Sequence, residues 1–149
     1  MRKLSISSFE KDHDTIKCGV SVSRVDKVGV VPITTYDIRV CIPNKESMSP
    51  KAAHSIEHLG AVWFRNLYKY KDDVIYFGPM GCLTGFYLIL KGNKKIEDVG
   101  KAVDDMFSFV VTSTEVPGAT RRECGNYKLH SLRKAKRLAN KYLIYEVLQ

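Results

Sequence analysis

The stretch TTYDIRVCI at positions 34–42 alternates apolar and polar side chains and organises the interpretation of the whole chain. One face carries the apolar side chains Tyr36, Ile38, Val40 and Ile42. The opposite face carries Asp37, Arg39 and Cys41. A period of two residues predicts a strand with one buried face and one polar face.

Three further strands surround this one in the sequence. The valine-rich segment 17–31, interrupted by Asp26 and Gly29, is predicted to be its hairpin partner. Residues 73–78 and 83–91 are predicted as two more strands, separated by the segment GPMGC. The sequence therefore predicts a sheet of four strands.

Three segments have the period of an amphipathic helix. Ser49 followed by Pro50 is typical of a helix start, and apolar positions at Ala53, Ile56, Val62, Phe64 and Leu67 extend that helix to about Tyr70. A second helix is predicted over 96–110 and a third over 129–143. Strands grouped in pairs between helices predict an α+β fold, with a mainly antiparallel four-stranded sheet packed against helices on one side. We expect residues 1–149 to form a single domain.

Composition limits the classes of protein to consider. The formal net charge is +8, and the basic residues concentrate between Arg121 and Lys141. They lack the aromatic-interleaved pattern of a nucleic-acid reader, so no nucleic-acid partner is expected. No apolar run approaches a membrane span, and the start does not resemble a signal peptide. We therefore expect a cytoplasmic protein that binds no membrane, with all four cysteines as free thiols.

The motif HSIEH at positions 54–58 predicts a metal-binding site. His54 and His58 lie four residues apart and project from one helix face, so both imidazoles can reach one cation, with Glu57 beside them. A catalytic metal site uses three protein ligands and one open position. The candidates for the third ligand are Cys82, Cys124, His13 and His130, and residue chemistry alone does not choose among them. His130 is expected to lie on the surface of the last helix.

Five segments together give the chain a family resemblance. They are SFEKDH, DIRVCIPN, HSIEHLGA, GPMGCLTGFYL and ECGNYKLHSL, in that order and over nearly the whole chain. The chain thereby resembles the S-ribosylhomocysteine lyases, the LuxS family that makes the precursor of the signal autoinducer-2. HSIEH alone would be far less specific than five segments in order.

The resemblance assigns roles to residues. It implies that His54, His58 and Cys124 bind one divalent metal per subunit, ferrous iron in the cell, which zinc or cobalt can replace. It makes Glu57 and Cys82 the acid–base pair. It places Ser8, His13 and Arg39 at a small-molecule substrate. It also implies a homodimer whose active sites lie at the subunit interface, each using residues of both chains.

The same resemblance implies a reaction. S-ribosylhomocysteine is cleaved to homocysteine and 4,5-dihydroxy-2,3-pentanedione after its carbonyl group has migrated along the sugar. A divalent metal stabilises the negative charge that develops at each migration, and two proton carriers serve the carbon chain. Because the shifts are internal redox, no nicotinamide is needed, and the chain has no G-x-G-x-x-G fingerprint.

Two departures from the family pattern and two rival functions remain. Ser55 replaces a common threonine, and Tyr76-Phe77-Gly78 stands where many members have an acidic residue and a serine that help hold the amino-acid end of the substrate. The first rival function is a metallohydrolase of the H-x-x-E-H type. The second is a basic nucleic-acid-binding domain with a structural metal closed by four ligands.

Overall fold

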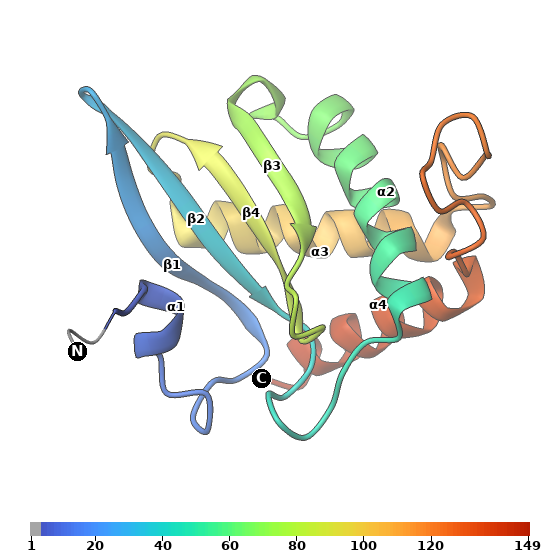
Figure 1. The fold of residues 1–149 in the computed structure, drawn as a ribbon, viewed down its shortest axis with the longest axis horizontal. Coiled ribbons are helices and arrows are strands. Elements are labelled where there is room, and N and C mark those ends of the chain that lie inside the picture. Colours follow the sequence, from blue (N-terminus) through green and yellow to red (C-terminus); the bar gives the residue numbers. More distant parts are fainter. Residues whose placement is uncertain (1–3) are drawn as a thin grey trace.

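The computed structural model describes residues 4–149 and contains one four-stranded sheet with four α-helices (Figure 1). The strands are β1 (Gly19–Val28), β2 (Val31–Arg39), β3 (Val74–Pro79) and β4 (Gly85–Lys91). The helices are α1 (Ser7–Glu10), α2 (Pro50–Asn66), α3 (Ile96–Thr112) and α4 (Leu132–Val147), with a short 3-10 turn, η1 (Lys71–Asp73), before β3. The predicted α+β class is confirmed.

The sheet is antiparallel throughout, in the order β1-β2-β4-β3. A two-residue turn joins β1 to β2, and Gly29 in that turn has a φ of +61°, which glycine adopts without steric cost. β2 and β4 are the central strands. The strand at 34–42 is therefore paired on both edges.

The prediction that β2 has one polar face at the surface was wrong, because both of its faces are buried. On the face away from the long helices, Asp37 and Arg39 are each buried to 3% side-chain exposure and form an ion pair. The alternation also ends earlier than predicted, since the N–H groups of Val40 and Cys41 both donate to the carbonyl of Thr84. Cys41 is consequently buried, whereas Ile42 turns toward solvent.

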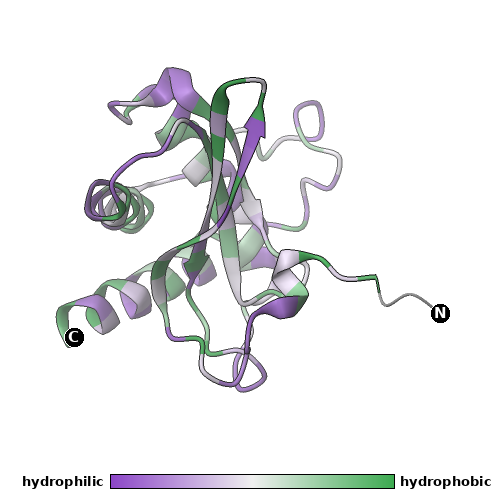
Figure 2. Cartoon of the chain, turned by 90° about the vertical axis from the view of Figure 1, so that its left-hand side faces the viewer, coloured by the Kyte–Doolittle hydropathy of each residue, from purple (hydrophilic) through white to green (hydrophobic). Residues whose placement is uncertain are grey.

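The hydrophobic core lies between the sheet and the helices α2, α3 and α4. Seen from the side, α3 and α4 lie on one side of the sheet and the N-terminal segment on the other (Figure 2). Tyr36 and Ile38 of β2 and Leu88 of β4 are fully buried on the helical side. Against them pack the buried α3 residues Val99, Ala102, Val103, Met106, Phe107 and Val110.

Several helix boundaries differ from the prediction: α3 extends to Thr112 and α4 to Val147, and the end of α2 and the start of α4 also shift. Helix α2 ends at Asn66 rather than near Tyr70, because the N–H groups of Leu67 and Tyr68 both donate to the carbonyl of Trp63. Leu67 and Val62, predicted to face inward, are exposed, and Leu59 and Trp63 take their place in the core. Helix α4 begins at Leu132, three residues later than predicted, because the Ser131 hydroxyl accepts from the N–H of Lys134 and caps it there.

Helix α2 packs so closely on β3 that one position tolerates no side chain. A Cβ atom added to Gly60 would collide with the ring of Phe77, whereas one added to Gly100 of α3 would meet nothing within 4 Å. We predict that Gly60→Ala lowers the free energy of unfolding by about 1–3 kcal/mol through overpacking. Gly100→Ala, the matched control, should raise it by up to about 1 kcal/mol, because alanine favours a helix.

Urea denaturation of both variants measures the two effects. Equal behaviour of Gly60→Ala and Gly100→Ala would contradict the close approach of α2 and β3.

Candidate metal centre and active site

Helix α2 presents the two histidines of the HSIEH motif. The Ser49 hydroxyl accepts from the N–H of Ala52 and Pro50 occupies the first turn, so the helix starts where the sequence predicts. Ile56 is buried in the core, and His54 and His58 are half-buried on a neighbouring face. Their ring centroids lie 4.8 Å apart.

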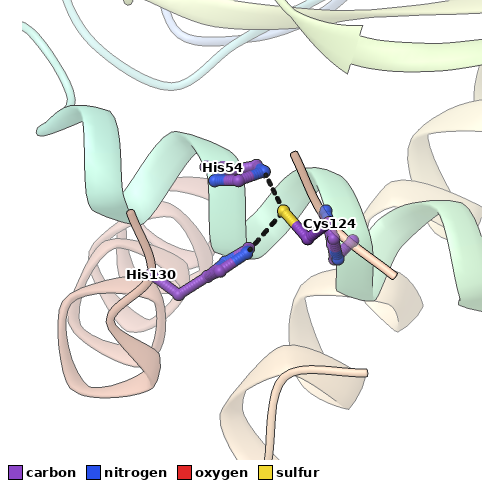
Figure 3. Close-up of side chains that lie close together, drawn as sticks. His54, Cys124 and His130 are labelled. Carbon is purple, nitrogen blue, oxygen red and sulfur yellow. Dashed lines mark hydrogen bonds between the residues drawn. The ribbon is translucent and has the colours of Figure 1, made fainter. Parts of the chain in front are cut away.

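Two more side chains join these histidines from the connection between α3 and α4. The Cys124 Sγ lies 3.5 Å from the Nε2 of His54 and 3.6 Å from the Nε2 of His130 (Figure 3). The potential ligand atoms of His54, His58, Cys124 and His130 all lie within 4.8 Å of one another. These four side chains form a His and Cys cluster of the kind that can hold a metal ion.

The chemistry of the donors fits a borderline-soft divalent ion such as zinc or ferrous iron. The Nδ1–H of His54 donates to the carbonyl of Leu129 and that of His58 to the carbonyl of Pro117, both at 2.8 Å. Each bond fixes the tautomer that leaves the Nε2 lone pair free for a metal. Backbone carbonyls thus orient both imidazoles.

The expectation that His130 lies on a helix surface was wrong. It precedes the cap of α4, is half-buried, and stacks on the ring of His54 with centroids 3.9 Å apart. Burial, together with the neighbouring His54 and His58, lowers the pKa of His130 to about 4, so its ring is neutral at neutral pH. The position of His130 only six residues after Cys124 could have indicated that the two side chains lie together. The helical pattern from Leu129 onward instead suggested a helix surface.

An open hollow of about 350 Å³ lies beside the metal-binding cluster. Its lining includes His54 and Glu57 of α2, Pro79 and Leu83 around the β3–β4 connection, and Asn126. Glu57 is half-buried there, next to the imidazole of His54 in the same wall. A carboxylate at this place can exchange protons with a small molecule held at the metal.

Cys82 lies on the same β3–β4 connection but in a different setting. Its Sγ is 3.0 Å from the hydroxyl of Thr84 and 4.0 Å from the Nη1 of Arg39. The same Nη1 donates to the Thr84 hydroxyl at 2.6 Å, and Asp37 holds the guanidinium through two further bonds. Burial raises the pKa of Cys82, but hydrogen bonds from Thr84 and the charge of Arg39 outweigh it, so the pKa is lowered from its ordinary value.

Two of the three predicted substrate residues gather around this thiol. Arg39 contacts it, and His13 lines with Cys82 and Thr84 a second hollow of about 360 Å³. The Nδ1 of His13 lies 2.9 Å from the carbonyl of Lys11, a residue that also pairs with Asp37. Ser8, the third, is half-buried in α1, five residues before His13.

A comparison with protein families decides the identity of the chain. The profile of the family described as S-Ribosylhomocysteinase (LuxS) matches residues 6–148. The chain belongs to the LuxS family. The resemblance noted from the five sequence segments is thereby confirmed, and the chain is a carbon–sulfur lyase of the S-ribosylhomocysteine lyase type.

Individual relatives support the LuxS assignment. The S-ribosylhomocysteine lyase of Phocaeicola vulgatus is 47% identical over 147 residues, covering 97% of this chain and 91% of the relative. That of Desulfotalea psychrophila is 48% identical, covering 92% and 87%. That of Clostridium acetobutylicum is 50% identical over 124 residues, covering 82% and 78%.

All four cysteines are free thiols, as predicted. Within residues 4–149, no helix combines the length and apolarity needed to cross a membrane.

The contacts of Cys82 give a prediction for its reactivity. Because Thr84 and Arg39 lower the pKa of Cys82, the thiolate persists at pH values below the ordinary thiol pKa. Iodoacetamide should therefore modify Cys82 before Cys41, whose pKa burial raises. Thr84→Val should move the pH profile of alkylation to higher pH, and Thr84→Ser should leave it in place.

Mass spectrometry of the alkylated protein across a pH series measures both effects. A profile for Thr84→Val that coincides with that of the unaltered protein would show that the hydroxyl does not tune this thiol.

Proposed function

We propose that this LuxS-family chain cleaves S-ribosylhomocysteine to homocysteine and 4,5-dihydroxy-2,3-pentanedione, the precursor of autoinducer-2. The observation that carries the proposal is the cluster of His and Cys side chains beside Glu57, on a chain that the family profile matches from residue 6 to residue 148. We further propose that residues 1–149 act as one domain in the cytoplasm. There the reaction serves the activated methyl cycle and supplies a quorum-sensing signal.

The substrate explains why the site needs proton carriers. A thioether leaves readily only when a neighbouring C–H bond is acidic. The open sugar has its carbonyl at C1, and two isomerisations move that carbonyl to C2 and then to C3. In each of them one proton moves between neighbouring carbons and one between their oxygens. The C4 proton is then acidic, and its removal forms a C4–C5 double bond as the C5–S bond breaks. The enol that remains tautomerises to the dione.

His54, His58 and Cys124 are the residues that we propose to hold the metal. When bound, a divalent metal acts as a Lewis acid that stabilises negative charge developing on the sugar oxygens. We propose ferrous iron as the metal in the cell, one ion per subunit, with zinc or cobalt as substitutes. The mixed imidazole and thiolate donors suit each of these ions.

Glu57 and Cys82 are the proposed proton carriers. Glu57 lines the hollow at the metal cluster and can take a proton from one carbon and return it to the next. Cys82, whose pKa Thr84 and Arg39 lower, can act as a base in its thiolate form and as an acid once protonated. In the homodimer proposed below, Glu57 of one chain and Cys82 of the other serve different sides of one carbon chain.

Ser8, His13 and Arg39 are proposed to bind the substrate. His13 lines the hollow at Cys82, and the Arg39 guanidinium borders it with its charge partly neutralised by Asp37. At the proposed amino-acid end of the substrate, the departures Tyr76 and Gly78 are in contact. The Tyr76 phenol lies over Gly78, where it occupies the space that a Cβ atom would need.

We propose that the chain works as a homodimer with active sites at the subunit interface. The N-terminal segment lies on the side of the sheet opposite α3 and α4 (Figure 2), and its Lys11 pairs with Asp37, which places Asp37 and Arg39 on that face. Tyr76 on this face is 45% exposed, and Phe9 of α1 is 75% exposed. A second copy would cover these apolar side chains and bring its own substrate residues to the neighbouring metal.

The two rival functions have less support. The family assignment to a carbon–sulfur lyase disfavours a metallohydrolase. The basic residues of α4, among them Arg133, Lys134 and Arg137, face solvent, which explains them as a solvated helix surface. We therefore propose that neither nucleic acid nor a membrane is a partner.

The proposed reaction is tested by incubating the metal-loaded protein with S-ribosylhomocysteine and measuring homocysteine with a thiol reagent. Glu57→Gln and Cys82→Ala should each lower turnover by about 10²–10⁴-fold, because each removes a proton carrier. Both should retain metal, which atomic absorption measures. Chelator should abolish turnover of the unaltered protein. Wild-type turnover in metal-loaded Cys82→Ala would refute the assigned role.

The shared active site predicts complementation between inactive chains. A mixed dimer of Arg39→Gln and His54→Ala should regain activity, because one of its two sites combines an intact metal centre with an intact Arg39. Since Arg39 contacts Cys82 of its own chain, Cys82→Ala should complement His54→Ala in the same way. Homocysteine release from coexpressed, differently tagged chains measures the recovery.

The control pairs His54→Ala with Glu57→Gln, both on α2, which should not recover. Activity in a species that sediments as a monomer would contradict the shared site, as would inactive mixed dimers of Arg39→Gln and His54→Ala.

A further inference from the structure

The segment of residues 4–15 carries two of the proposed substrate residues, Ser8 and His13, but it buries no side chain in its own chain. None of its residues is buried, and Phe9 is 75% exposed. Among the residues that the structure describes, the hydrogen bonds of this segment all run within the segment itself. Apolar packing therefore does not fix where the segment lies on the sheet.

An ion pair joins this segment to the sheet instead. The Nζ of Lys11 lies 3.5 Å from the Oδ2 of Asp37 on β2. The side chain of Asp37 is 3% exposed and that of Lys11 is 26% exposed, so water and salt screen the pair only in part. Asp37 is also the carboxylate that accepts from the Nε and Nη2 of Arg39. The segment is thus held at the ion pair that lies beside Cys82.

The backbone of the same lysine holds His13. The Nδ1 of His13 lies 2.9 Å from the carbonyl oxygen of Lys11, and because a carbonyl only accepts, Nδ1 carries the proton. The Nε2 of the neutral ring is then free to accept a hydrogen bond. His13 lines with Cys82 and Thr84 the hollow of about 360 Å³. Lys11 therefore links this imidazole to the buried carboxylate, with its side chain on Asp37 and its carbonyl on His13.

We propose that Lys11 is a positioning residue that sets where His13 lies relative to Cys82 in this hollow. The inference rests on the proposed function for the identity of the substrate, whereas the holding of the segment can be measured without any reaction. The Lys11 ammonium pairs with Asp37, so the residue acts through His13 and not on the substrate itself.

Hydrogen–deuterium exchange tests whether Lys11 holds the segment. Lys11→Met removes the ammonium, while Asp37 keeps both of its bonds to Arg39 and the sheet stays intact. Mass spectrometry at short labelling times should show faster exchange over residues 4–15 in Lys11→Met and unchanged exchange over α2. Lys11→Arg, which keeps the positive charge, should restore the slower exchange.

The matched control is Lys17→Met, which removes the same charge from an exposed position shortly after the segment. It should exchange like the unaltered protein. Equal exchange over residues 4–15 in Lys11→Met and Lys17→Met would overturn the proposal.

Homocysteine release tests the positioning of His13. Metal-loaded Lys11→Met should raise KM for S-ribosylhomocysteine by about 10–100-fold, because a displaced imidazole no longer meets the substrate. Lys11→Arg should restore KM. A mere loss of folded protein would instead lower the apparent kcat and leave KM in place. In a His13→Ala background, Lys11→Met should raise KM no further, because the lysine acts through that histidine.

An unchanged KM in Lys11→Met, or an equally large further rise in the His13→Ala background, would show that Lys11 does not position His13. If the unaltered protein releases no homocysteine, the proposed function fails, and the exchange comparison alone decides whether Lys11 holds the segment.

Discussion

The close approach of helix α2 to strand β3 is the constraint on which the rest of the structure depends. Gly60 has no room for a side chain because the ring of Phe77 lies against it, and the Phe64 and Phe77 rings pack with centroids 5.1 Å apart. With α2 held at this depth and rotation, Ile56 enters the core. His54 and His58 are then turned toward the connection between α3 and α4. A helix packed one side chain further out would present the same histidines to solvent.

The positions of Cys124 and His130 depend on hydrogen bonds between the α3–α4 connection and α2. Three of its backbone groups bond to α2 side chains. They are the carbonyls of Pro117 and Leu129 and the N–H of Ser131. These bonds carry Cys124 and His130 to the histidines and fix the imidazole tautomers at the same time. Hydrogen bonds between the connection and α2 therefore bring the cluster together, and the metal-binding geometry follows from them.

On the other side of the β3–β4 connection, an ion pair and hydrogen bonds position the side chains around Cys82. Burying Asp37 and Arg39 removes both charges from water, and their paired hydrogen bonds offset that cost. Arg39 then has a free Nη1 to direct at Thr84 and Cys82. The hollow beside the metal ligands and the hollow at the tuned thiol share the short β3–β4 connection, in which Leu83 adopts a positive φ of +57°.

The sequence by itself determined the elements and their class, since period two in β2 and period 3.6 in α3 depend only on which side chains avoid water. It also determined the pair His54 and His58, because spacing along one helix places them on one face. Only the tertiary structure decided that His130 joins Cys124, that Ser55 stands behind it, and that Asp37 and Arg39 are buried. Those contacts join residues that lie up to 76 positions apart or depend on where a helix cap falls. Local periodicity carries no information about such distances, because they are set by the packing of elements against one another.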